Sequence, residues 1–317
     1  MSKLVLIDGH SILYRAYHAI PSLTSPDGKP TNAVFGFISM LLRTLQELKP
    51  DYTVIVFDRP GGTFRNQWYP NYQAQRKTPD DDFIVQIDTT ENLLKSMGFC
   101  TEGQVGYEAD DIIGTLSNKV AEMPNEKIDI VIVTSDRDQL QLVNDHVRLL
   151  MPAVSLGVTK LYGEKETVER MGVTPAYIAD FKGLAGDPSD NIPGVPGIGP
   201  KTAADLINRF GSLEEIYEHL SEVEKSSVRE KLENNRDIAF LSKKLATIVL
   251  DAPVAIDWSK WTTPDLVRPE IVTSLHELGF ESLVKRLTKP ISGVAVKQVQ
   301  PAVQKQPQKN DEQMELF

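Results

Sequence analysis

Three carboxylates crowd into four residues of the segment GYEADDIIGTL, at positions 106–116. They belong to Glu108, Asp110 and Asp111, and an apolar helical pattern follows them at once. One acid suits a helix N-terminus, because the helix dipole and the free N–H groups favour negative charge there. Three acids raise one another's pKa, since like charges lie a few ångströms apart. The spacing therefore predicts that this segment binds a cation.

Further acids follow three short apolar runs: LVLI (4–7), TVIVF (53–57) and IVIVT (130–134). These runs are rich in Val and Ile and too short for typical helices, a pattern that is typical of buried parallel strands. Asp8 follows the first run and Asp58 the second, whereas Asp136 and Asp138 follow the third. A single aspartate after a strand is most often a helix cap or a turn residue. Its recurrence after three strands favours a shared acidic site.

Helical patterns separate the apolar runs, at residues 34–48, 83–97 and 111–123. This alternation predicts an α/β fold with a mainly parallel central sheet and flanking helices. Ligands of such sheets bind outside the carboxyl ends of the strands, which is where these aspartates would gather.

The predicted cation is a divalent metal ion. Histidine is scarce, and we expect none beside these acids, which disfavours a zinc-type site. Carboxylate oxygens are hard ligands that suit Mg²⁺ or Mn²⁺. The acids outnumber the needs of one ion, so two ions that clamp the attacking and leaving oxygens of a phosphodiester fit better.

Composition sets the wider limits. The chain has 317 residues, room for about two domains. Its net charge of −10 argues against a polyanionic partner unless many of the acids bind cations. Cys100 is the only cysteine, which excludes an internal disulfide. We find no signal peptide or membrane-length apolar run, and we expect a cytoplasmic monomer.

A glycine-rich turn occupies the segment GDPSDNIPGVPGIGPKTAA, residues 186–204, after a helical pattern at 174–185. It contributes two more carboxylates, and Pro200 is well suited to begin the next helix. Helix, glycine hairpin and helix can bind a nucleic-acid backbone without reading bases. The GxxxxGK[ST] spacing of a P-loop is not met. A plain αα-hairpin with glycines for tight packing is the alternative. The residues concerned are Asp187, Asp190, Gly194, Gly197, Gly199, Lys201 and Thr202.

These motifs together resemble the 5′→3′ exonuclease domain of bacterial DNA polymerase I and the wider flap endonuclease family. The resemblance runs from residue 3 to about residue 289. Its motifs are LIDGHSILYRAYHA (6–19), VFDRPGGTFR (56–65), GYEADDIIGTL (106–116), TSDRDQLQLV (134–143) and GLAGDPSDNIPGVPGIGPKTA (183–203). It implies a PIN-like 5′ nuclease fold in which nine acids surround two metal ions: Asp8, Asp58, Glu108, Asp110, Asp111, Asp136, Asp138, Asp187 and Asp190.

The resemblance also implies two DNA-binding regions. Residues 190–204 correspond to a helix–three-turn–helix that holds duplex DNA, with a K⁺ ion on its carbonyls. Residues 64–100 correspond to a helical arch for a 5′ single strand. Cations and aromatic rings suit that role. The expected DNA contacts outside the hairpin are Arg15, Arg65, Tyr72, Gln73, Arg76 and Lys77, with Arg76 also assigned to catalysis.

The arch departs from the family at one position. The family pattern is Tyr-Lys-x-x-Arg, but here residues 72–76 read YQAQR. Gln73 can donate a hydrogen bond but cannot supply a charge beside the reacting phosphate.

The sequence predicts three regions: an α/β catalytic core (1–180), a helical DNA-binding region (181–288) and a disordered tail (289–317). Residues 289–312 have a linker composition. The last five residues resemble the short peptide by which bacterial replication proteins bind the sliding clamp. Its contacts would be Gln313, Met314, Leu316 and Phe317.

We therefore expect a standalone, structure-specific 5′ nuclease of DNA replication and repair. The alternative is a non-catalytic junction-binding protein of the same fold, with Gln73 as a mark of lost activity. A phosphatase of the haloacid dehalogenase kind is excluded, because it needs an acid where His10 stands. The sequence does not decide between exonuclease and flap endonuclease activity or show a preference for RNA primers.

Overall fold

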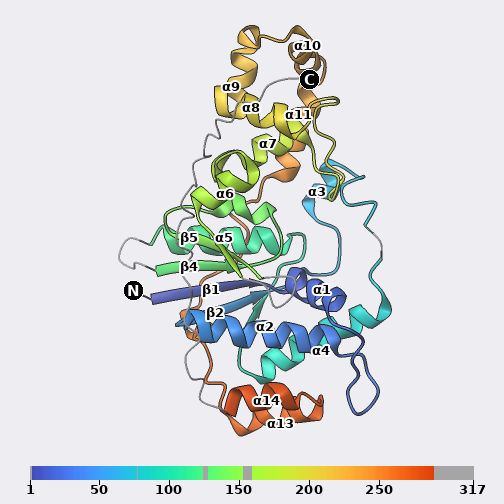
Figure 1. The fold of residues 1–317 in the computed structure, drawn as a ribbon, viewed down its shortest axis with the longest axis vertical. Coiled ribbons are helices and arrows are strands. Elements are labelled where there is room, and N and C mark those ends of the chain that lie inside the picture. Colours follow the sequence, from blue (N-terminus) through green and yellow to red (C-terminus); the bar gives the residue numbers. More distant parts are fainter. Residues whose placement is uncertain (1, 77, 124–127, 153–158, 289–317) are drawn as a thin grey trace, which may run out of the picture.

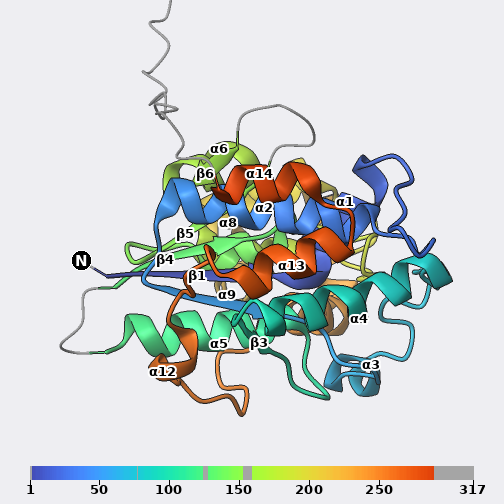
Figure 2. The ribbon, with the colours of Figure 1, turned by 90° about the horizontal axis from the view of Figure 1, so that it is seen from below.

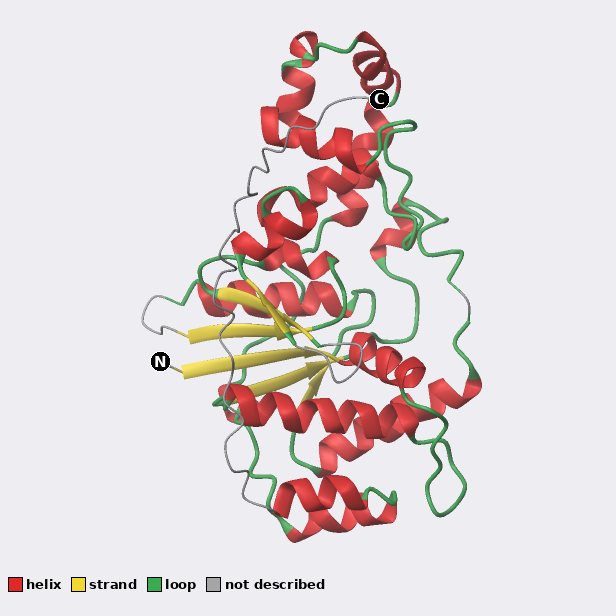
Figure 3. Ribbon diagram, in the orientation of Figure 1, coloured by secondary structure: helices red, strands yellow, loops and turns green. Residues whose placement is uncertain are grey.

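A six-stranded sheet forms the centre of the protein in the computed structural model, which describes residues 2–76, 78–123, 128–152 and 159–288 (Figures 1 and 3). The strand order is β3-β2-β1-β4-β5-β6, with all neighbours parallel except β5 and β6. The predicted α/β fold is confirmed. The strands are β1 Ser2–Asp8, β2 Tyr52–Val56, β3 Cys100–Glu102, β4 Ile128–Val133, β5 Val147–Met151 and β6 Lys160–Tyr162.

Both faces of the sheet are buried, which explains why its central strands read as continuous apolar runs. Alternate residues of β1 enter two cores: Leu4 and Leu6 pack with α5 on one face, and Val5 and Ile7 pack with α1, α2 and α4 on the other. Figures 1 and 2 show these two helical layers. The helices are α1 Gly9–Ala19, α2 Asn32–Leu48, α4 Asp81–Ser96 and α5 Ala109–Ala121.

Two C-terminal helices complete the layer beneath the sheet in Figure 1. They are α13 Pro269–Glu277 and α14 Glu281–Thr288, and they contribute Ile271, Leu275 and Phe280 to the core that contains α2 and α4. None of the helices in the described part of the chain combines the length and the apolar character needed to span a bilayer.

A helical region lies beyond α5 on the other side of the sheet (Figure 1). Its apolar residues, such as Leu206 and Leu232, belong to the same core as Leu4 and Leu6 of β1. The predicted boundary at residue 180 falls inside α7. The elements are α6 Glu164–Met171, η2 Pro175–Tyr177, α7 Ile178–Ala185, α8 Pro200–Phe210, α9 Leu213–Glu218, η3 Leu220–Glu222, α10 Ser226–Asn234 and α11 Arg236–Ala246. The chain then returns to the sheet, where α12 Trp258–Trp261 packs against β2.

The segment predicted as an arch consists of a short helix, α3 Phe64–Trp68, followed by turns and then α4. Its first part contacts the helical region. The backbone N–H of Gln73 donates to the carbonyl of Asp190, and the side chain of Asn191 donates to the carbonyl of Asn71. The turns before α4 are therefore held against the glycine hairpin.

Candidate metal centre and nucleic-acid interface

The carboxyl ends of three neighbouring strands converge on a cleft of about 1110 Å³. Asp8 ends β1, while Asp58 and Asp136 follow β2 and β4 by two and three residues. The chain order reverses between β1 and β4, and ligands of open α/β sheets bind beside such a reversal. Eight of the nine predicted acids line the cleft: Asp8, Asp58, Glu108, Asp110, Asp136, Asp138, Asp187 and Asp190.

Asp8 is buried and Asp110 is half-buried, and the polar partners of both carboxylates are uncharged. Asp8 accepts hydrogen bonds from the backbone N–H of Ser11 at 3.0 Å and from the hydroxyl of Thr134 at 2.8 Å. The amide of Gln139 donates to Asp8 at 2.9 Å and to Asp110 at 2.5 Å. No ion pair to either carboxylate exists among the residues that the structure describes.

This environment makes the charged forms of both acids unfavourable. Burial, followed by repulsion from Asp58, raises the pKa of Asp8 to about 7. Burial, followed by repulsion from Asp136 and Asp8, raises the pKa of Asp110 well above its usual value. Buried carboxylates without a counter-charge can be stabilised by a bound cation. The all-oxygen donor set is the kind that Mg²⁺ and Mn²⁺ prefer.

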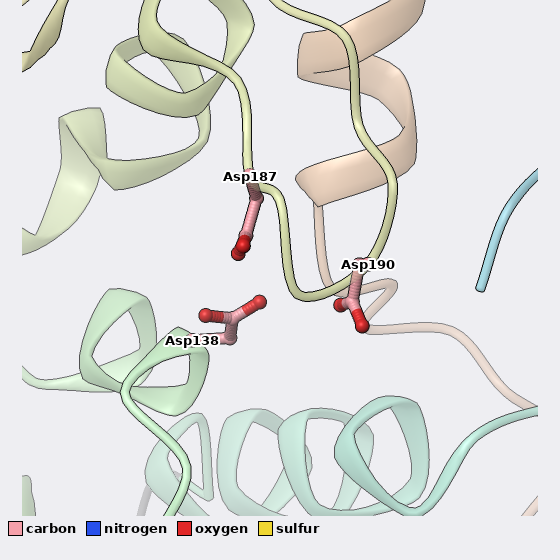
Figure 4. A group of neighbouring side chains, drawn as sticks. All are labelled: Asp138, Asp187 and Asp190. Carbon is pink, nitrogen blue, oxygen red and sulfur yellow. The ribbon is translucent and has the colours of Figure 1, made fainter. Parts of the chain in front are cut away.

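A second group of carboxylates consists of Asp138, Asp187 and Asp190, and Figure 4 shows Asp138 and Asp187 facing one another. One oxygen from each of the three lies within 4.8 Å of the others. The ammonium of Lys182 donates to both Asp138 and Asp187. Arg76 donates to Asp190 at 2.5 Å. This group therefore already holds positive charge supplied by the chain.

Glu108 and Asp58 lie between the two groups. Burial raises the pKa of Glu108 to about 7 although Arg65 lies 3.0 Å away. Asp58 accepts from the backbone N–H of Ala109 at 2.8 Å. Its own N–H donates to Nδ1 of His10 at 3.1 Å. The prediction that no histidine lies beside the acids is therefore wrong, because the turn after β1 places His10 against the end of β2.

Asp111 is the ninth predicted ligand, and it is not among the residues that line the cleft. The carboxylate is fully buried and forms two hydrogen bonds with the guanidinium of Arg65, at 2.7 and 2.8 Å. It also accepts from the backbone N–H groups of Glu108 and Val249. These hydrogen bonds to the carboxylate all come from donors of the protein itself. Asp111 therefore anchors the start of α5 and does not line the cleft.

Arg65, predicted to contact DNA, is buried in this structure. Only 2% of the surface of Arg65 is exposed. Its guanidinium also donates to the backbone carbonyls of Leu245 and Thr247, at 2.9 and 2.8 Å. Attraction to Asp111 and Glu108 outweighs burial and raises the pKa of Arg65. Arg65 is therefore a permanent charge that joins α3, α5 and the end of α11.

Tyr72 is also a structural residue in this conformation. It is 4% exposed and packs with Ile192, Leu245 and Ala246, so its ring is not available for stacking on a base. Its hydroxyl donates to Glu108 at 3.2 Å. Contact between Tyr72 and DNA stays a prediction, and it would require a different arrangement of this ring. The alternating polar and aromatic pattern does not distinguish an exposed stacking ring from a buried one.

Gln73, Arg76 and Arg15 do line the cleft. Gln73 has a left-handed backbone conformation, with φ of 55°, which turns its amide toward Glu108 and Asp190 at 3.4 and 3.3 Å. Arg15 donates to the hydroxyl of Ser135 at 3.1 Å. Lys77 and the tail residues 313–317 lie outside the described residues.

The glycine hairpin has two kinds of glycine. Gly194, at φ 62°, lies so close to Gly186 that a Cβ would meet its backbone nitrogen at 2.3 Å, and its own N–H donates to Ser242. Gly194 therefore serves tight packing, as the alternative interpretation of the segment expected. Gly199 has open space around it and is the N-cap of α8, whose first turn carries Lys201, exposed, and Thr202, half-buried.

Sequence reasoning missed three residues that donate hydrogen bonds to the acids of the cleft: Lys182, Gln139 and Thr134. Gln139 and Thr134 lie within two residues of predicted acids in the segment TSDRDQ. This closeness in sequence could have indicated that they contact the acidic site. Lys182 is five residues before Asp187 in a helix that reads as apolar. No local pattern indicates that its side chain turns toward Asp138, 44 residues away.

Fold and site together define an α/β protein with an acidic cleft at the carboxyl edge of its sheet, beside a helix–hairpin–helix. Residues 3–172 match the family model of the 5′-3′ exonuclease N-terminal resolvase-like domain. Residues 173–268 match that of the 5′-3′ exonuclease C-terminal SAM fold. The chain therefore belongs to the 5′-3′ exonuclease family, and the predicted nuclease assignment is confirmed.

Curated relatives agree with this family. The chain is 43% identical to DNA polymerase I of Caldicellulosiruptor bescii over 287 residues, which cover 90% of this chain and 33% of the relative. It is 38% identical to DNA polymerase I of Bacillus subtilis over 285 residues, covering 90% and 32%. The chain thus spans about a third of the length of these relatives.

Solved structures share the fold. The T5 5′-exonuclease with bound zinc has a TM-score of 0.66 at 20% identity, covering 90% of this chain and 98% of that one. The catalytic core of Rad2 in complex with a DNA substrate has a TM-score of 0.59 at 17% identity, covering 92% and 93%.

Proposed function

We propose that this protein is a divalent-metal-dependent 5′ nuclease that hydrolyses a phosphodiester near a junction of single-stranded and duplex DNA. The convergence of eight carboxylates on one cleft carries the proposal. The pKa of Asp8, raised to about 7, and that of Asp110, raised well above its usual value, indicate a site that lacks a counter-charge. Solved structures of the same fold in complex with metal ions and with DNA support the same class of substrate.

Two groups of acids would hold the ions, Mg²⁺ or Mn²⁺. Asp8, Asp110 and Asp136 would hold the first, and Asp138, Asp187 and Asp190 would hold the second, with Asp58 and Glu108 between them. When bound, two such ions activate water and stabilise the leaving oxygen of a phosphodiester.

The chain's own cations would position the substrate. Arg15 and Arg76 line the cleft, where a guanidinium can form two hydrogen bonds with a phosphate. Lys201 and the free N–H groups at the start of α8 would bind a phosphate of the duplex arm. We further propose that carbonyls of the hairpin bind K⁺.

A 5′-labelled flap DNA tests the proposal. Cleavage should require Mg²⁺ or Mn²⁺ and stop in EDTA. Asp136→Ala should abolish it while preserving the fold, because the change removes one charge from a repulsive cluster. Asp251→Ala, at an exposed acid outside the cleft, is the control. Full cleavage by Asp136→Ala would contradict the assignment.

The same experiment separates the second candidate, a non-catalytic junction-binding protein, which Gln73 alone favours. Binding of the flap without cleavage in either metal would support that candidate. The retained carboxylates weigh against it, because a protein with no need of metal would be more stable without their repulsion.

The tail interpretation stays a prediction, since residues 313–317 lie outside the described structure. Linked binding modules raise local concentration at a target. Deleting 313–317 should therefore leave cleavage of short flaps unchanged and abolish binding to a bacterial sliding clamp in calorimetry. Clamp binding that survives the deletion would contradict this prediction.

A further inference from the structure

Lys182 lies inside the acidic cleft, where the proposed function places a metal ion. It belongs to the last turn of α7, and the residue is 5% exposed. Its ammonium donates to the carboxylates of Asp138 and Asp187. Lysine is rarely buried unless its charge is paired, so these two acids are the reason that the ammonium remains there.

The charges of this cluster are strongly interdependent. Burial alone would lower the pKa of Lys182, but attraction to Asp138 and Asp187 outweighs burial and raises it. The same ammonium holds the pKa of Asp187 below its usual value despite burial. Lys182 thus stays charged at neutral pH and neutralises the acids beside it.

A divalent ion at Asp138, Asp187 and Asp190 would need oxygens of the same carboxylates. Each of the first two offers an oxygen within 4.8 Å of the others, and Lys182 already binds both residues. An ammonium and a metal ion at this position would repel each other and share the same ligands. The two cations are therefore mutually exclusive at this half of the cleft.

We propose that Lys182 is a tethered counter-ion that occupies the second half of the acidic site and must move away before a divalent ion binds there. This inference rests on the proposed function, because it concerns the same metal site. Asp8 and Asp110, whose partners are uncharged, form the half that binds an ion first. The flexible four-carbon stem of lysine allows the ammonium to leave its carboxylates and bind a substrate phosphate in the cleft. Arrival of the substrate would thereby favour entry of the second ion.

A purely structural role is the competing explanation: Lys182 would stabilise the turn between α7 and the hairpin and would have no effect on metal binding. The chain offers a matched control for it. Lys243 of α11 also joins two acids, Asp180 of α7 and Glu214, at 2.7 and 2.6 Å. That clamp lies outside the cleft.

Calorimetric titration with MnCl₂ in the absence of DNA separates the two explanations. The full chain should show one tight and one weak binding event. Lys182→Gln should tighten the weak event by at least about tenfold, because a competing charge is gone, and leave the tight event unchanged. Lys243→Gln should change neither. An unchanged or weakened second event in a folded Lys182→Gln protein would overturn the inference and leave the proposed function intact. A wild-type protein that binds no Mn²⁺ would overturn both.

Covalent labelling of the wild-type chain provides a second test that does not depend on a variant. Lys182 should react slowly with an amine-specific reagent in EDTA and faster at Mn²⁺ concentrations that fill the weak site, as read by mass spectrometry. The reactivity of Lys243 should stay constant. Labelling of Lys182 that does not respond to Mn²⁺ would overturn the inference.

Discussion

The acids of the cleft occupy two contrasting environments. Asp8 and Asp110, at the strand ends, receive hydrogen bonds from a hydroxyl, a backbone N–H and an amide. Asp138 and Asp187, beside α7, hold the ammonium of Lys182. The first environment leaves negative charge for an external cation to balance, whereas the second balances it internally.

Asp111 has a third environment, in which the charge of the carboxylate is balanced entirely by a side chain of the protein. Its carboxylate is fully buried and bound on both oxygens by Arg65. Asp110 and Asp111 are consecutive residues, but neighbouring side chains on a helix point about 100° apart. Asp110 therefore lines the cleft, whereas Asp111 faces Arg65. The comparison shows that a carboxylate of this protein has a structural role where a side-chain cation of the chain pairs with it. A carboxylate without such a partner is available to bind a metal ion.

Removing Arg65 should have the largest effect on stability. Arg65→Met leaves Asp111 as an unpaired buried charge, which costs about 3–5 kcal/mol. Denaturant unfolding in EDTA measures the loss. The double variant Arg65→Met/Asp111→Asn should recover part of it, since the asparagine keeps an acceptor for the backbone N–H groups without the charge.

A matched control for this loss is Arg148→Met. Arg148 pairs with Asp129 at 2.6 Å near the surface, where its side chain is 43% exposed. Such a pair contributes less than about 1 kcal/mol. Equal losses for Arg65→Met and Arg148→Met would remove the distinction between the buried pair and a surface pair.

The acids whose pKa is raised by burial should make the metal-free protein less stable as pH rises. Asp8 and Glu108 have pKa values of about 7 when folded, against 3.8 and 4.5 as reference values for the unfolded chain. Between these limits the folded state binds more protons than the unfolded state, so the free energy of unfolding falls as pH increases toward 7 and above.

Thermal unfolding in EDTA from pH 5 to 8 tests this dependence. The midpoint should fall over the interval, and saturating Mg²⁺ should reduce or reverse the fall because the ion takes the place of the protons. Mg²⁺ affinity should accordingly rise with pH. A midpoint in EDTA that increases from pH 5 to 8 would contradict the raised pKa values of Asp8 and Glu108.

Gln73→Lys should have the smallest effect, because it adds a further tethered cation beside Glu108 and Asp190. We expect flap cleavage at saturating Mg²⁺ to rise by less than about tenfold, through charge near the phosphate. An unchanged rate would mean that Arg76 already supplies this charge. A lower rate would mean that the new ammonium competes with metal for Glu108 or Asp190. Gln75→Lys, two residues away, is the control.

Sequence patterns alone determined the elements that carry the site. The apolar runs 4–7, 53–57 and 130–134 coincide with β1, β2 and β4 to within a residue or two at each end. They could be recognised because a strand that is buried on both faces must be continuously apolar. The acids that follow them meet because parallel strands end at one edge. Pro200 begins α8 because proline suits the first helical position. These features depend on residues close together in the chain.

Only the tertiary structure decided which acids are free and which are paired. Arg65 lies 46 residues from Asp111, and Lys182 lies 44 residues from Asp138. Whether such a cation faces solvent, DNA or a buried carboxylate depends on the packing of α3 and α7 against distant elements. The sequence around the cation does not distinguish these three surroundings. The sequence therefore located the carboxylates, and the fold assigned their counter-charges, because charges interact through space regardless of their separation along the chain.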